Sequence, residues 1–191
     1  MTLSRLTAKA AGIAVLAALL VSPGTASAAQ PPSDRGWVDI DPTAPVITRK
    51  EIVIHAPLKK IWAIQTDIEN WPKWQPEVVS AKRVDRGRLK VGSVFQWEVQ
   101  GLHVTSTVKQ VIPRRRVVWG GPGNGITAVH VWTFTPVRGG VLVHTEESWT
   151  GAPVEADVPY AQAALDASLT AWLENLKRVS VEGFPAVRGR R

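Results

Sequence analysis

The sequence predicts an α+β domain in which one antiparallel sheet curls around a single long helix near the C-terminus. Residues 78–150 alternate apolar and polar side chains with a period of two, which is typical of strands that bury one face. Gly or Pro lies in most gaps between these runs, so short turns should join the strands. Apolar side chains at helical spacing follow, and a sheet with one apolar face can bury it against such a helix.

The elements expected before residue 78 are one strand and two short helical pieces. VITRKEIVIHA, residues 46–56, is rich in β-branched residues and predicts a strand. Pro57 can open a helix over residues 57–66. Pro72 and Pro76 cannot lie inside a continuing helix, so IENWPKWQP should form a short broken turn.

Six further strands and one long helix complete the prediction. The strands are expected at about 78–86, 93–99, 102–112, 116–120, 126–136 and 140–150. The helix places one apolar stripe on its buried side: Leu165, Leu169, Trp172, Leu173, Leu176 and Val179. Gly183 and Pro185 end it. The glycine-rich Gly120–Gly125 predicts a flexible connection at the mouth of the interior rather than a phosphate loop, because no Gly-Lys-Ser/Thr follows it.

The N-terminal residues 1–28 have the pattern of an export signal. Arg5 and Lys9 form a basic start before an apolar run of about 12 residues, and small residues lead up to Ala28. The apolar run is too short for a membrane span, which needs about 20 residues. We expect cleavage near Ala28 and a secreted or cell-envelope location, with retention as an uncleaved anchor as the alternative. The remaining chain divides into a Pro-rich linker at 29–45, one domain at 46–183 and a basic disordered tail at 184–191.

Composition excludes several classes of function. The chain has no cysteine, so thiol chemistry and zinc–thiolate sites are ruled out. The net charge of +7 is dispersed and no groove-reading motif is present, so we expect no nucleic-acid partner. The basic runs at 114–116 and 188–191 leave open a weak association with an anionic cell surface, although a solvated turn and tail is the simpler interpretation. We expect a monomer.

Strand parity predicts which side chains share the inner face. A turn at Gln100-Gly101 sets Trp97 opposite Val104 and Glu98 opposite His103 on the solvent side. A turn at Arg138-Gly139 sets His130 opposite Glu147, on the same face as Trp132, Phe134 and Trp149. A slip by one residue would instead bring His144 and Glu146 to that face.

A buried His130–Glu147 pair would have chemical consequences. Desolvation raises the pKa of the carboxyl group and lowers that of the histidine, whereas the attraction between their charges acts in the opposite direction on both. A pair of groups whose pKa values are shifted in this manner can serve as a proton relay. A structural ion pair at the strand ends is the simpler interpretation. The four histidines lie on separate strands without a short ligand spacing, so we expect no metal, and no motif indicates a cofactor.

Three segments resemble a known family: EIVIHAPLKKIWAIQTDIENWPKWQPEVVSAKRV, AVHVWTFTPVRGGVLVHTEESWTG and LTAWLENLKRVSVEG. They are similar to polyketide cyclase/dehydrase members of the START/Bet v 1-like (SRPBCC) superfamily, over residues 47–182. The resemblance implies a helix-grip fold: a curved seven-stranded antiparallel sheet, two short helices, and a long C-terminal helix over a hydrophobic cavity. It carries over no specific catalytic residue.

Strand parity and this fold together give the candidate site. The residues expected to bind a ligand are Trp71, Trp74, Phe95, Trp97, Trp132, Phe134, Trp149, Tyr160, Leu165, Leu169 and Trp172. His130 and Glu147 are the candidate catalytic residues, with Tyr160 also a candidate, and His144 and Glu146 replace the pair under the slipped register. Trp71 and Trp74 also suit a structural role, in which they pin the turn beneath the long helix.

Three functions follow from these expectations. The favoured one is an exported carrier of a small hydrophobic molecule such as a lipid, polyketide or isoprenoid, because it needs only the cavity. The alternative is a cofactor-independent cyclase or dehydratase that uses acid–base residues in the cavity. The third is a cell-envelope interaction protein whose cavity is filled by tryptophans.

Overall fold

The computed structural model describes residues 36–184; the predicted export signal and residues 185–191 lie outside this range. Seven strands form one antiparallel sheet in the order β1-β7-β6-β5-β4-β3-β2. The strands are β1 (Val46–Ile54), β2 (Val78–Arg83), β3 (Val94–Val99), β4 (Leu102–Ile112), β5 (Arg116–Gly123), β6 (Ile126–Val137) and β7 (Gly140–Thr150). The helices are α1 (Leu58–Thr66), the 3₁₀ helix η1 (Ile68–Lys73), α2 (Ala152–Ala156) and α3 (Val158–Glu182).

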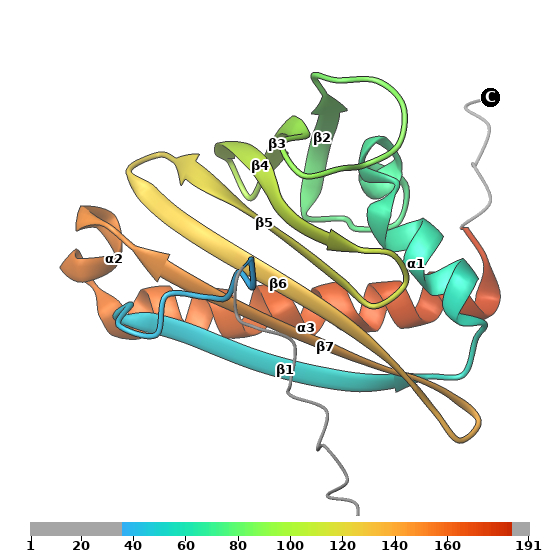
Figure 1. The fold of residues 1–191 in the computed structure, drawn as a ribbon. Coiled ribbons are helices and arrows are strands. Elements are labelled where there is room, and N and C mark those ends of the chain that lie inside the picture. Colours follow the sequence, from blue (N-terminus) through green and yellow to red (C-terminus); the bar gives the residue numbers. More distant parts are fainter. Residues whose placement is uncertain (1–35, 185–191) are drawn as a thin grey trace, which may run out of the picture. The chain divides into compact units, whose positions relative to one another are not determined.

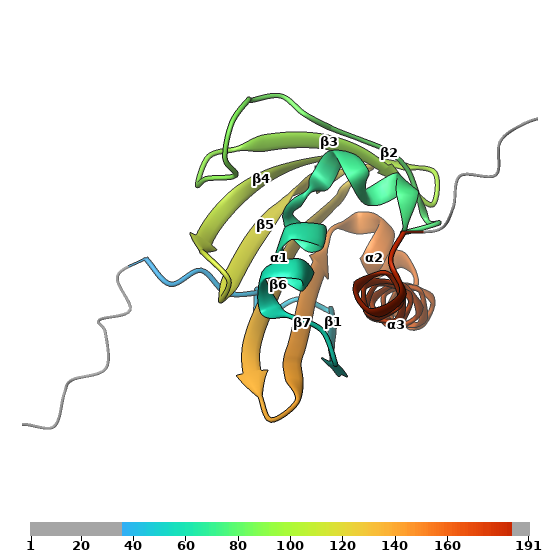
Figure 2. The same cartoon turned by 90° about the vertical axis from the view of Figure 1, so that its right-hand side faces the viewer.

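The long helix α3 lies across the concave side of the curved sheet (Figures 1 and 2). It begins at Val158, earlier than the apolar stripe alone indicates, because Asp157 caps it: Asp157 Oδ1 accepts a hydrogen bond from the Tyr160 amide at 3.0 Å. The predicted stripe from Leu165 to Val179 is buried along its whole length. The predicted α+β helix-grip architecture is therefore confirmed.

The strand register also agrees with the parity argument. Trp97 lies opposite Val104 in the β3–β4 hairpin, and His130 lies opposite Glu147 in the β6–β7 hairpin. The slipped register is wrong: Glu146 lies opposite Val131 on the outer face and forms an ion pair with Arg49 at 3.0 Å. Alternation along β7 then places Glu147 on the inner face.

Aromatic rings fill the interior at the end covered by α1 and η1. Pro72 lies within η1, which is the short broken turn expected there, and it places Trp71 and Trp74 beneath α3. The Trp71 ring packs edge-on against Trp172 with centroids 5.1 Å apart, and Trp74 packs against the same ring at 5.5 Å. Phe95, Trp97, Trp119 and Trp132 also belong to this aromatic cluster. The rings pack directly against one another, with centroids about 5–6 Å apart.

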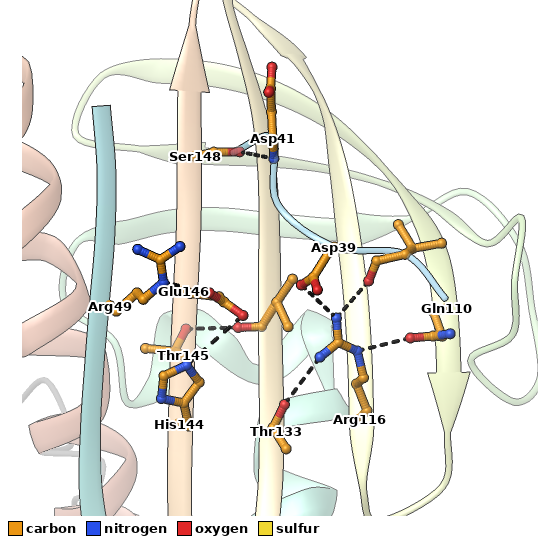
Figure 3. Close-up of polar contacts among 12 residues, drawn as sticks. Asp39, Asp41, Arg49, Gln110, Arg116, Thr133, His144, Thr145, Glu146 and Ser148 are labelled. Atoms are coloured by element: carbon orange, nitrogen blue, oxygen red, sulfur yellow. Dashed lines mark hydrogen bonds and ion pairs between the residues drawn. The ribbon is translucent and has the colours of Figure 1, made fainter. Parts of the chain in front are cut away.

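The segment before β1 is packed on the outer face of the sheet instead of forming a free linker (Figure 3). Ile40 is buried against Val118 and Val131. Arg116 is only 6% exposed, and its guanidinium donates to the Val38 carbonyl, to Asp39 and to Gln110. We call residues 36–45 the outer strap. Arg116 is thus an anchor for this strap, whereas the sequence suggested a solvated turn at residues 114–116.

Candidate functional site

The space left on the concave side is a small hollow at the opposite end from η1, which we call the inner pocket. Its cavity volume is about 50 Å³, far below the roughly 300–1,000 Å³ of ordinary ligand pockets, so it has room only for the tip of a larger molecule. Its wall is almost entirely apolar, with one acid: Trp97, Val99, Leu102, Val104, Gly121, Gly123, Ile126, Ala128, Glu147 and Trp149. The hydrophobic cavity implied by the family resemblance corresponds to this small pocket.

Two glycines of β5 form one side of the inner pocket. Gly120–Gly123 belong to the strand, so the predicted flexible connection is limited to the turn that follows. A Cβ atom on Gly121 would lie 2.1 Å from the Thr105 carbonyl oxygen, and one on Gly123 would lie 2.9 Å from a Val104 methyl group. Only glycine fits at such close strand contacts, and the absence of side chains here leaves the hollow.

The polar part of the site is a buried hydrogen-bonded chain behind the pocket wall. Glu147 Oε2 lies 3.1 Å from His130 Nδ1, and the other carboxylate oxygen accepts a hydrogen bond from the Trp149 indole at 2.8 Å. His130 Nε2 lies 2.8 Å from the Thr145 hydroxyl, which donates in turn to the Val131 carbonyl at 3.1 Å. Because the hydroxyl proton of Thr145 is used in this way, Nε2 must be the donor to Thr145.

This arrangement leaves one proton between Glu147 Oε2 and His130 Nδ1. Burial raises the pKa of Glu147 to about 7, with the Trp149 hydrogen bond acting against the rise. Burial lowers the pKa of His130 to about 3. Both directions favour the uncharged pair, in which Glu147 is a carboxylic acid that donates to a neutral imidazole. The pocket therefore presents an acid that keeps its proton close to neutral pH.

The predicted site residues fall into four groups. Trp97, Trp149 and Glu147 line the inner pocket, with His130 directly behind Glu147. The aromatic residues Trp71, Trp74, Phe95, Trp132, Phe134 and Trp172 lie in the packed core at 0–2% exposure. Leu165 and Leu169 are buried in a separate apolar cluster with Trp149 packed against it. Tyr160 is 74% exposed on the first turn of α3 and lines no part of the pocket.

Sequence reasoning missed Trp119 and the role of Thr145. Trp119 lies opposite His130, and their ring centroids are 5.1 Å apart. Asn124-Gly125 is a two-residue turn signal, with φ of 50° and 82°, and pairing the strands around it would have placed Trp119 beside His130. Thr145 lies opposite Trp132, and only the side-chain geometry shows that its hydroxyl sets the histidine tautomer.

Nowhere in residues 36–184 do three His, Asp or Glu side chains come together in a group that could hold a metal ion. No helix within the same residues is long and apolar enough to cross a membrane.

Comparisons with known proteins agree with the fold. A protein of Streptomyces halstedii, provisionally named a polyketide cyclase, is 46% identical over 39 residues, which are 20% of this chain and 36% of that protein. A hypothetical protein of Helicobacter pylori superposes with a TM-score of 0.66 at 20% identity, covering 74% of this chain and 91% of its own. A START superfamily protein of Mycobacterium smegmatis gives 0.62 at 17% identity, covering 70% and 96%.

The family comparison extends over most of the chain. A family model described as polyketide cyclase/dehydrase and lipid transport matches residues 45–181, from the end of the outer strap almost to the end of α3. The match includes every strand, the aromatic cluster and the His130–Glu147 pair. The chain therefore belongs to the polyketide cyclase/dehydrase and lipid transport family.

Proposed function

We propose that the protein binds a small hydrophobic molecule that carries a hydroxyl group. Its apolar end lies in the inner pocket, and its hydroxyl donates a hydrogen bond to Glu147 Oε1, because the Glu147 proton is already donated to His130 Nδ1. The observation that supports this proposal is the position of Glu147, the single acid in an otherwise apolar pocket wall, with a pKa raised to about 7. A lipid, a polyketide or an isoprenoid has the required chemistry. The bulk of such a ligand extends past the half-buried Trp97 and Trp149.

A matched pair of probes tests the proposal. 1-Naphthalenemethanol carries a hydroxyl group and naphthalene does not, and binding is followed through the indole N–H signals of Trp97 and Trp149 in NMR spectra. The alcohol should bind more tightly as the pH rises through 7, because the Glu147 carboxylate is a stronger hydrogen-bond acceptor than the acid. Naphthalene binding should not depend on pH.

The isosteric variant Glu147→Gln is the control. Its amide oxygen accepts and does not titrate, so the variant should remove the pH dependence of alcohol binding and leave naphthalene unaffected. If neither probe shifts the signals of Trp97 and Trp149, the proposed binding site is wrong.

A second candidate function is a cofactor-independent dehydratase or cyclase. The single shared proton of the Glu147–His130 pair favours it, because general acid–base catalysis needs a pKa near the working pH. In a dehydration, Glu147 would protonate a β-hydroxyl group as its C–O bond breaks and water leaves. The resulting carboxylate would then take up the α-proton, which restores the acid.

The dehydratase candidate predicts turnover of a simple β-hydroxy ketone. With 4-hydroxy-4-phenyl-2-butanone, the conjugated enone product is detected by its ultraviolet absorbance. The rate should fall above pH 7 and be lost in Glu147→Gln. Unchanged turnover in that variant would exclude Glu147 as the acid.

We also propose that the protein acts outside the cytoplasm. Only the pattern of residues 1–28 supports this proposal. The mass of the protein recovered from culture medium should correspond to a chain that begins near Ala29. Recovery of the uncleaved chain from the cells alone would contradict it.

A further inference from the structure

A second hollow lies outside the sheet's concave core, between α1, the β2–β3 connection and the β4–β5 turn, and we call it the α1 groove. Its volume is about 610 Å³, within the range of ligand sites and far larger than the inner pocket. Lys59, Trp62, Ala63, Thr66 and Asp67 line it from the α1 side. Arg83, Gly87, Arg88, Leu89, Val111, Pro113 and Arg114 form the remaining wall. These three segments lie at the same end of the molecule (Figures 1 and 2).

The floor of the α1 groove is apolar and held in place. Trp62, Leu89 and Val111 are half-buried there. The Trp62 ring packs edge-on against Phe134, with centroids 5.4 Å apart and an interplanar angle of 75°. Because Phe134 belongs to the packed core, the indole is fixed before any ligand arrives, which lowers the entropic cost of binding.

The rim carries exposed positive charge without matching negative charge. Lys59, Arg88 and Arg114 are exposed, and none of the three forms an ion pair with another residue in the range 36–184. Asp67 is the single acid among the lining residues, and it accepts a hydrogen bond from Asn70. An apolar floor beneath three free cations is complementary to an anion with an apolar body.

The β2–β3 part of the rim is ordered by its own polar contacts. The Arg83 guanidinium donates to the Gly87 carbonyl at 2.7 Å and to Asp85 at 3.0 Å. The Ser93 hydroxyl donates to the same carboxylate at 2.7 Å, and this bond, helped by Arg83, keeps the pKa of Asp85 below its ordinary value. Arg83 is thus occupied in shaping the rim, and its neighbour Arg88 remains available for a ligand.

Arg114 occupies a backbone position that disfavours it. It follows Pro113 in a turn closed by a hydrogen bond from the Arg115 amide to the Ile112 carbonyl at 2.9 Å. Its φ of 60° lies in the left-handed region, where this type of turn ordinarily takes glycine. A strained arginine on the rim of a cationic groove is an independent indication that its guanidinium has a role there.

From these observations we infer that the α1 groove binds an amphiphilic organic anion, with its apolar body on Trp62 and its sulfonate, carboxylate or phosphate between Arg88, Arg114 and Lys59. This site is separate from the inner pocket and does not depend on the proposed function. A soluble anion fits better than a lipid surface, because the indole lies at the floor of a concave groove and does not protrude.

A matched pair of probes distinguishes this site from the inner pocket. 8-Anilinonaphthalene-1-sulfonate is an aromatic anion, and N-phenyl-1-naphthylamine is its neutral counterpart. All nine tryptophans lie within residues 36–184, so each indole N–H gives a separate NMR probe once Trp62→Phe identifies the Trp62 signal. The anion should shift the Trp62 signal and the neutral probe should not. Shifts confined to Trp97 and Trp149 would overturn the inference.

Substitutions of two arginines on the rim and of one arginine beside it test the role of the rim charges. Arg88→Ala and Arg114→Gly should each weaken binding of the sulfonate about tenfold, because each removes a charge-assisted contact. Arg114→Gly should also raise the melting temperature, since glycine relieves the strained φ, so lost binding cannot be attributed to unfolding. Arg115→Ala removes the same charge from the same turn but lies outside the groove lining, and it should leave binding unchanged.

Two outcomes contradict the inference. An equal loss of affinity in Arg115→Ala would indicate attraction by general charge rather than a site. Sedimentation with phosphatidylglycerol vesicles but not phosphatidylcholine vesicles, without binding of the monomeric sulfonate, would indicate a lipid surface as the partner instead.

Discussion

The two ends of the concave side are built from the same residue type and differ in what lies opposite the rings. At the α1–η1 end, Trp71 meets Trp172, Phe95 and Trp119, and the rings fill the space. At the pocket end, Trp149 and one side of Trp97, whose ring also packs on Trp71 at 5.6 Å, border a wall that includes Gly121 and Gly123, and a hollow remains. Tryptophan content therefore does not by itself indicate a ligand cavity; the residues facing the tryptophans decide between core and site.

The largest expected effect is the loss of a ring from the packed end. Trp71→Ala should lower the free energy of unfolding by about 3–5 kcal/mol, because the buried ring contacts several others and leaves a large cavity. Trp149→Ala should cost about 2 kcal/mol or less, since its ring is half-buried beside an existing hollow. Urea denaturation measures both, and equal losses would remove the distinction between the two ends.

The pH dependence of stability tests the acid pair at the pocket end. In the folded protein, Glu147 and His130 together hold one proton between about pH 3 and about pH 7. In the unfolded chain the same two side chains have ordinary pKa values of 4.5 and 6.5, so they hold one proton only between pH 4.5 and pH 6.5. Stability should therefore be flat from pH 4.5 to 6.5. It should fall as the pH rises from 6.5 through 7, and as it drops from 4.5 towards 3.

Single variants separate the two contributions. In His130→Asn, Glu147 alone has a raised pKa, so stability should fall by about 3 kcal/mol as the pH rises from 4.5 through 7. In Glu147→Gln, His130 alone has a lowered pKa, so stability should be lost as the pH falls from 6.5 towards 3. Urea denaturation over a pH series gives both slopes, and flat profiles in both variants would contradict the assigned pKa directions.

Loss of contacts on the outer face of the sheet should lower the stability of the protein without changing the two ends of the concave side. Arg116→Met removes the buried guanidinium that holds the outer strap, and we expect a loss of about 2 kcal/mol together with faster proteolysis within residues 36–45. The indole signals of Trp97 and Trp149 should not move. Arg115→Met is the matched control, and its effect should lie within about 0.5 kcal/mol. An unchanged proteolysis rate in Arg116→Met would show that the strap does not depend on this anchor.

Local patterns predict the sheet and its register well and predict the site incompletely. The two-residue turns at Gln100-Gly101 and Arg138-Gly139 are short-range signals that determine register, and so His130 is correctly placed opposite Glu147. The size of the pocket depends on how rings from η1, α3 and four strands share one interior, which no local pattern contains. The burial of Arg116 could not be predicted from a local pattern either, because it depends on the outer strap, which is distant in sequence.

The smallest expected effect comes from one substitution made at both ends. Trp71→Phe and Trp149→Phe each keep an aromatic ring and remove an indole N–H. The Trp71 indole donates to the Gln65 carbonyl at 3.0 Å, and the Trp149 indole donates to Glu147 at 2.8 Å. Each variant should lose about 1 kcal/mol of stability, since each removes one hydrogen bond.

Only the change at the pocket end should alter the pH profile. The Trp149 hydrogen bond lowers the pKa of Glu147, so its removal should raise that pKa and extend the loss of stability that begins near pH 6.5 to a higher pH, which makes the total loss larger. Trp71→Phe should leave the profile unchanged, because the Gln65 carbonyl does not titrate. A shift in both variants would mean that the packed end and the pocket end are electrostatically coupled, and the distinction between a structural end and a chemical end would then fail.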